Sequence, residues 1–293
     1  MTDPDFDDEP QSSETFFRTA VAVEGGLGVL ALLLGYLFGP DPRDLVPRPD
    51  QIAFLVSGLG WGVVATVPLL ILMSVIRRIK HPAIEELDQM SDHPMIELML
   101  KLGPIELFVI SLCAGVGEEL LFRGWLMPGI ANLLNGEAMS LLPSDPSTPR
   151  PSWAFGGWTA EIARSGSESA GGFSWAGFTQ WWSESVGWEM AVAWIASSVA
   201  FGFVHPVSKL YIAVTGLMGL YFGGLLLLTG NLLIPIVAHA LYDAIQLWGA
   251  SWAEASDKSD EEASDEEAVE EEASVEEASE KAVEEASEEA KSS

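Results

Sequence analysis

The sequence has almost no cysteine and little positive charge. Its one cysteine, Cys113, rules out an intrachain disulfide, and the chain has no CxxC pair of the kind that binds metals. Because Cys113 stands in an apolar run, we interpret it as a packing residue. The 14 Lys and Arg residues stand against 43 Asp and Glu, and the formal net charge is -29 at pH 7. This sign disfavours nucleic acid as a partner, because nucleic acids are themselves polyanions.

The chain also lacks the regular alternation of apolar and polar residues that is typical of soluble domains. Hydrophobic residues make up 48% of the sequence and the mean hydropathy is +0.25 despite the large charge, so the apolar residues are concentrated in blocks. Most blocks approach the length of about 20 residues that crosses a bilayer as a helix. They predict an all-α, polytopic transmembrane bundle of about six to seven spans, with the lipid bilayer as a partner. The blocks are Ala20–Phe38, Ile52–Ile76, Ile105–Val116, Met190–Val204, Leu210–Leu228 and Leu232–Trp248.

The first block has none of the features of a removable signal peptide. It follows an acidic segment, has no basic region beyond Arg18 and shows no clear cleavage site, so we expect it to stay as the first span. Residues 1–14 are expected to be an acidic, disordered N-terminus. The densest basic cluster, residues 77–80, follows the second block and is expected to face the cytoplasm. We therefore predict a multi-pass protein of the cell membrane with both termini cytoplasmic.

Residues 15–250 are expected to form the transmembrane domain. Within it, the apolar stretch 102–134 exceeds one crossing, which predicts a span that reaches into residues 118–123 and is followed by a broken or interfacial piece. The polar loop 135–187 contains five tryptophans and is expected to lie along the membrane interface. These tryptophans are Trp153, Trp158, Trp175, Trp181 and Trp182.

Residues 251–293 form an acidic, low-complexity tail. From Glu254 to the end it has 18 acidic residues against three lysines, and it repeats EEAS and EEAV motifs. Because like charges repel and little apolar surface is available for a core, we expect a mostly disordered tail. The rest of the chain still carries about -14, which favours the hypothesis of halophilic, high-salt adaptation.

Ionisable residues within apolar stretches need a reason, because a charge at the bilayer centre costs about 2.5–3.5 kcal/mol on insertion scales. In the segment EELLFR, Glu119 and Arg123 have i,i+4 spacing and can pair, which leaves Glu118 free as a reactive carboxylate. A purely structural charge network is the alternative. Glu24, two turns inside the first block, is expected to pair with Arg18 or to extend toward the headgroups, and we do not assign it to a site.

Two further motifs place histidines in apolar segments. In FGFVH, Phe201 and His205 have i,i+4 spacing, and a histidine of this kind is often only a packing residue. In HALYD, His239 and Asp243 share one face in the middle of the last block, where they suit a metal site or a proton relay.

Glu118, His205, His239 and Asp243 come from three separate helices. Two imidazoles and two carboxylates are an ordinary ligand set for a divalent metal, zinc above all, and two carboxylates balance its charge. Such a metal would lower the pKa of a bound water. Alternatively, Glu118 serves as a general base toward that water, and a metal-free mechanism stays open.

The three motifs, in this order, resemble those of the CPBP intramembrane peptidase family, also called the CAAX-protease, bacteriocin-processing or Abi family. Its pattern of EExxxR, FxxxH and HxxxN or HxxxD matches residues 118–123, 201–205 and 239–243, and the resemblance covers residues 100–250. It implies that Glu118 and His205 activate water, that His239 and residue 243 complete the site, and that Glu119 and Arg123 support it. Many members have Asn where this chain has Asp243, which cannot donate a hydrogen bond when ionised.

We therefore expect a membrane-embedded endopeptidase, metal-dependent or of the glutamate type, that cuts a membrane-associated protein or peptide. The substrate class stays open, and a C-terminally modified substrate is one of the options. Two alternatives remain. The same side chains suit an ion- or proton-coupled transporter, although the sequence shows no clear internal repeat, and the fold also suits a non-catalytic scaffold or immunity protein.

Overall fold

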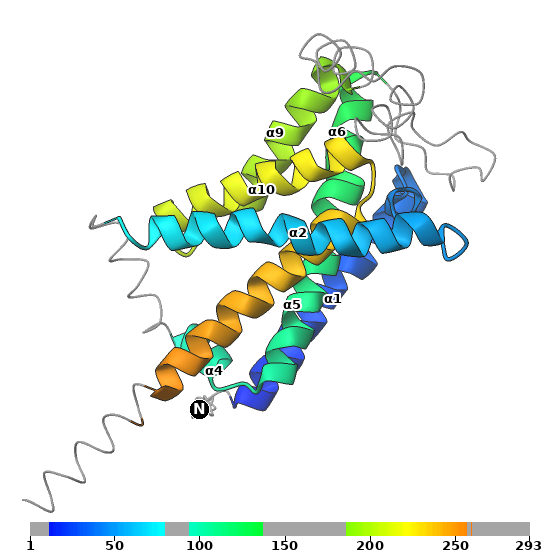
Figure 1. The fold of residues 1–293 in the computed structure, drawn as a ribbon. Helices are drawn as coiled ribbons and strands as arrows, with labels where there is room; N and C mark the ends of the chain where they lie inside the picture. Colours follow the sequence, from blue (N-terminus) through cyan, green and yellow to red (C-terminus); the bar gives the residue numbers. More distant parts are fainter. Residues whose placement is uncertain (1–11, 80–93, 137–185, 257–258, 260–293) are drawn as a thin grey trace, which may run out of the picture. The chain divides into compact units, whose positions relative to one another are not determined.

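A computed structural model describes residues 12–79, 94–136, 186–256 and 259, and every regular element among them is a helix (Figure 1). The chain divides into two units, Met1–Gln246 and Leu247–Ser293, and the candidate site lies in the first. The elements are α1 (Ser13–Phe38), the 3-10 helix η1 (Pro42–Leu45), α2 (Ile52–Ile76), α4 (Pro94–Leu100), α5 (Pro104–Glu119), the π-helix η3 (Leu120–Leu126), α6 (Met127–Leu134), α9 (Gly187–Phe203), α10 (Lys209–Thr229) and the helix Leu233–Ser256.

Four helices among the described residues are long and apolar enough to cross a membrane: α1, α2, α10 and Leu233–Ser256. Many of their large apolar side chains point away from the protein interior, as Val29, Trp61 and Ile71 do on α1 and α2. Such surfaces need lipid around them, so the all-α class and the membrane location are confirmed. The apolar helices α5 and α9 have 16 and 17 residues, and the prediction of six to seven spans stays a prediction.

Several predicted boundaries shift in the structure. α1 begins at Ser13, where the Ser12 hydroxyl accepts a hydrogen bond from the amide of Thr15, so residues 13–14 of the expected disordered N-terminus are helical. The last helix continues through Ser256, so residues 251–256 of the expected tail are helical too. Residues 1–11, most of loop 135–187 with its five tryptophans, and the tail beyond residue 259 lie outside the described residues.

Small residues allow the helices to approach closely. On α2, Gly58 and Gly62 face the helix Leu233–Ser256, where a Cβ at Gly62 would lie 2.5 Å from the Cβ of Val237. Gly28 of α1 lies against Gly117 of α5, and these two helices run side by side (Figure 1). This packing of small on small residues is typical of helices in membranes, and it brings α1 against the segment that contains Glu118.

The connection after α1 packs beneath the π-helix. Pro42 of η1 is buried, and a Cβ at Gly124 of η3 would lie 2.6 Å from its Cβ. Burial raises the pKa of Asp41, but hydrogen bonds from the side chain and amide of Arg43, with its charge, outweigh this and hold the pKa below its usual value. The pair fixes the conformation of η1 itself, and Pro42 packs this helix against η3, close to the EELLFR motif.

Candidate active site

The EELLFR motif lies where α5 changes into a π-helix. Glu118 and Glu119 end α5, and Arg123 lies in η3, which continues into α6. The expected break after residues 118–123 is therefore a π-helical segment, which keeps the chain helical. π-helical turns widen the backbone spiral and occur often at functional sites, because they change the direction in which side chains point. Here Glu118 and Glu119 are both buried, and Glu118 lies among histidines.

Arg123 is a buried cation that pairs with Glu119. Its Nη1 atom lies 2.9 Å from Glu119 Oε1, and both side chains have 0% exposure, so the ion pair expected from their spacing is present. The guanidinium carbon lies 4.1 Å from the centre of the Phe201 ring. Phe222 and Phe122 also face the guanidinium, and such ring faces attract a buried cation.

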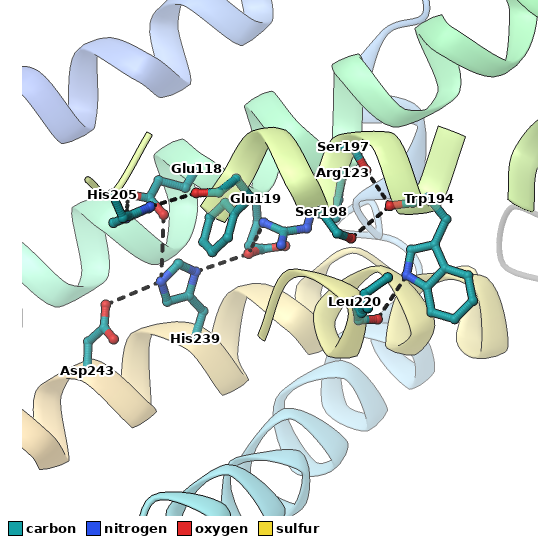
Figure 2. Close-up of polar contacts among 11 residues, drawn as sticks. Glu118, Glu119, Arg123, Trp194, Ser197, Ser198, His205, Leu220, His239 and Asp243 are labelled. Atoms are coloured by element: carbon teal, nitrogen blue, oxygen red, sulfur yellow. Dashed lines mark hydrogen bonds and ion pairs between the residues drawn. The ribbon is translucent and has the colours of Figure 1, made fainter. Parts of the chain in front are cut away.

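His239 lies at the centre of the polar cluster (Figure 2). Its Nδ1 atom lies 3.0 Å from Glu119 Oε1, so Glu119 contacts both Arg123 and His239. Its Nε2 atom lies 3.3 Å from Asp243 Oδ2 and 3.8 Å from Glu118 Oε2. The ring stacks on Phe222 with centroids 4.8 Å apart. His239 is therefore fixed by stacking on one face and by carboxylates at its two nitrogens.

His205 follows the end of α9 instead of lying on it. The next residue is Pro206, and a residue before proline is disfavoured in the α conformation, so α9 ends at Phe203. The Nδ1 atom of His205 lies 2.8 Å from the Phe201 carbonyl oxygen, which only accepts, so Nδ1 carries hydrogen. Its Nε2 atom lies 3.5 Å from Glu118 Oε1. Phe201, expected to support the site, holds His205 in this orientation.

The two oxygens of Glu118 thus face two different histidines. The distances of 3.5 and 3.8 Å exceed ordinary hydrogen bonds, and Oε2 has no hydrogen-bond partner among the described residues. Beside them lies a cavity of about 100 Å³, which has room for water. It is lined by Met73, Glu118, Phe201, His205, Tyr211, Val214, Thr215, Met218, His239, Tyr242 and Asp243.

The structure therefore brings together all four residues that the motifs single out: Glu118, His205, His239 and Asp243. In the part of the chain that it describes, no group of three or more His, Cys, Asp or Glu side chains is arranged to hold a metal ion. The zinc site stays a prediction, which elemental analysis of protein purified without a histidine tag would test.

Glu24 lies closer to this cluster than its sequence position indicates. It does not pair with Arg18, whose Nη2 atom lies 2.7 Å from Glu14 Oε1. Its backbone carbonyl lies against Gly117, next to Glu118 in the chain, and its Oε2 atom is buried without a hydrogen-bond partner among the described residues. Glu24 has no ionisable residue four positions before or after it, and the small residue Gly117 beside the EELLFR motif is the local feature that permits this close approach.

Tyr211 and Met73 also line the cavity although the motifs do not include them. Both belong to helices whose apolar composition predicts only a membrane span, so no local pattern distinguishes them.

Comparison with known families supports the reading of the motifs. A family model described as "Type II CAAX prenyl endopeptidase Rce1-like" matches residues 101–145 and 171–245. No curated protein and no solved structure matches the chain. The matched ranges contain every residue of the three motifs. The family recognised from those motifs is therefore confirmed, and the segment that holds the candidate site matches the Rce1-like type II CAAX prenyl endopeptidases.

Proposed function

We propose that this protein is an intramembrane endopeptidase in which Glu118 and His205 activate a water molecule. The observation that carries the proposal is the placement of Glu118, whose two oxygens face His205 and His239 beside a cavity with room for water. A carboxylate that is buried beside two imidazoles and retains an unpartnered oxygen is suited to take a proton from water.

The reaction proceeds in two proton transfers. Glu118 accepts a proton from a water in the adjoining cavity that contacts both Glu118 and His205, and the oxygen of that water forms a bond to the peptide carbonyl carbon. The resulting tetrahedral intermediate collapses when the C–N bond breaks. The departing nitrogen takes the proton that Glu118 had accepted, so one water and one peptide bond give a carboxylic acid and an amine.

The neighbouring residues act by positioning these groups. Glu119 accepts from His239 Nδ1 and is itself fixed by Arg123, so the imidazole cannot rotate away from Glu118. Asp243 contacts His239 Nε2 at 3.3 Å. As an ionised carboxylate, Asp243 orients the imidazole and cannot donate to a developing oxyanion.

For the substrate, we propose a protein C-terminus that carries a prenyl chain. An apolar groove of about 570 Å³ runs between α2, α9 and α10, and Met218 lines both this groove and the catalytic cavity. The groove is lined by apolar side chains such as Leu69, Leu72 and Leu217, which suit an isoprenoid chain and offer little to a polar ligand. The matching family model is named for prenyl endopeptidases, which agrees with this choice.

Glu118→Gln tests the proposal. The amide keeps the size of the side chain but cannot serve as a base, so we expect cleavage of a farnesylated peptide with a C-terminal CAAX sequence to fall by at least about 10²-fold. The measurement uses the full chain in liposomes and detects the released tripeptide. The same peptide without the farnesyl group tests the role of the groove and is expected to be a poor substrate.

Glu106→Gln is the matched control, because Glu106 lies at the other end of α5 and caps the helix by accepting from the amide of Gly103, which glutamine can also do. Equal cleavage by wild type and Glu118→Gln would refute the proposal. Proton or ion flux that depends on Glu118, in the absence of any cleavage, would favour the transporter instead.

A further inference from the structure

Tyr211 is a fixed element of the cavity wall. It lies in the first turn of α10, where its amide donates to the Ser208 hydroxyl at 3.1 Å and its carbonyl accepts from the Thr215 hydroxyl at 2.8 Å. Its ring centre lies 6.3 Å from that of His205, and it lines the cavity together with Glu118 and Asp243. The helix cap therefore holds the phenol beside the reacting groups.

Most of the other polar groups that line the cavity either cannot donate a hydrogen bond or already face a partner. Glu118 and Asp243, when ionised, can only accept hydrogen bonds. The nitrogens of His205 and His239 face the Phe201 carbonyl and the carboxylates of the cluster. The Thr215 hydroxyl donates to backbone carbonyls of its own helix. Tyr242 also lines the cavity, but of the two tyrosines only Tyr211 has a ring contact with His205 among the described residues.

The Tyr211 hydroxyl can donate a hydrogen bond, and no protein group among the described residues accepts its hydrogen. When water adds to a peptide carbonyl, the carbonyl oxygen becomes negative inside a cavity that two carboxylates already border. That oxygen needs a hydrogen-bond donor that is in place before the reaction begins.

We propose that the Tyr211 hydroxyl donates a hydrogen bond to the carbonyl oxygen of the substrate as it becomes an oxyanion. This role rests on the proposed peptidase function, and it fills the need for a donor that Asp243 cannot meet. The hydroxyl keeps its own proton, so no further acid, base or metal is required. Removal of one such donor from a peptidase costs about 10²–10³-fold in kcat.

Tyr211→Phe tests this role, since it removes only the hydroxyl. With the farnesylated CAAX peptide and the full chain in liposomes, we expect kcat to fall by about 10²–10³-fold while KM changes by less than about threefold. Tyr36→Phe is the control, because Tyr36 is half exposed on α1 and lines neither the catalytic cavity nor the apolar groove. That variant is expected to leave both the Tm and kcat close to those of wild type.

A second readout separates catalysis from structure. A peptide with a phosphinate in place of the scissile bond carries the tetrahedral oxygens of the intermediate, so Tyr211→Phe should weaken its binding by about the same factor as kcat. If the phenylalanine variant is unstable, kcat and phosphinate binding can be compared between Tyr211→His and Tyr211→Leu. The first side chain has a hydrogen-bond donor and the second has none.

The outcomes are distinct. A kcat that Tyr211→Phe leaves unchanged, or phosphinate binding that does not weaken when kcat falls, would overturn the role of Tyr211 while the Glu118 result stands. A wild-type protein that cleaves no better than Glu118→Gln would overturn both proposals together.

Discussion

At the scale of single residues, the buried pair Arg123–Glu119 is the most sensitive point of the site. Arg123 has 0% exposure, and its Nε and Nη2 atoms lack hydrogen-bond partners among the described residues, so Glu119 and the surrounding rings provide most of its compensation. Replacing one partner of such a pair with a neutral residue leaves the other charge unpaired in a medium of low dielectric constant.

We therefore expect Glu119→Gln to lower the free energy of unfolding by about 3–5 kcal/mol, with thermal unfolding in detergent as the measurement. The double variant Glu119→Gln with Arg123→Met removes both charges and should regain part of this loss. It should stay inactive, because His239 loses its carboxylate partner at Nδ1. Arg18→Met is the control, since the Arg18–Glu14 pair is exposed and such pairs contribute at most about 1 kcal/mol. Equal effects at both pairs would contradict this account of the cluster.

At the scale of helices, close approach between α2 and the helix Leu233–Ser256 aligns the segment that contains His239. A Cβ at Gly62 would lie 2.5 Å from the Cβ of Val237 and 3.1 Å from the carbonyl oxygen of Ile234. Backbone atoms cannot move aside as a flexible side chain can, so even one methyl group must separate the two helices.

Gly62→Ala is thus expected to destabilise the protein by about 1–3 kcal/mol and to lower peptidase activity, as measured by Tm and by cleavage rate. Gly60→Ala, on the same helix, is a matched control because no atom lies within 4 Å of its Cβ position. A Tm lower by the same amount in both variants would indicate a general effect of alanine on α2 instead of loss of close packing.

The helices also show what the sequence could and could not predict. Spacing of four residues is a local property, so the pair Glu119–Arg123 and the shared face of His239 and Asp243 follow from the sequence. The end of α9 before His205 also follows from a local feature, Pro206, whereas the π-helix and the position of Glu24 depend on which helices meet. Arg18 is the partner expected for Glu24. It pairs instead with Glu14, which lies four residues before Arg18 and is therefore better spaced on the helix.

At the scale of the whole molecule, the net charge of -29 is the property that the site does not explain. Of the acidic residues, 18 lie between Glu254 and Glu289, and the rest of the chain still carries about -14. Repulsion among like charges opposes a compact state, and dissolved ions reduce it because they shorten the Debye length from about 30 Å at 0.01 M to about 3 Å at 1 M. The hypothesis of high-salt adaptation is therefore a statement about how stability depends on ionic strength.

We expect the Tm of the full chain in an uncharged detergent to rise as KCl increases from 0.01 M to 1 M, with most of the rise below about 0.3 M, where screening changes fastest. Sucrose, which is excluded from protein surfaces but carries no charge, provides the control, because it stabilises compact states without screening. The buried Arg123–Glu119 pair is shielded from solvent ions, so its contribution should stay constant across the series, and the double variant should show the same salt dependence as wild type. A Tm that is independent of KCl would refute high-salt adaptation and would leave the acidic residues without a role in stability.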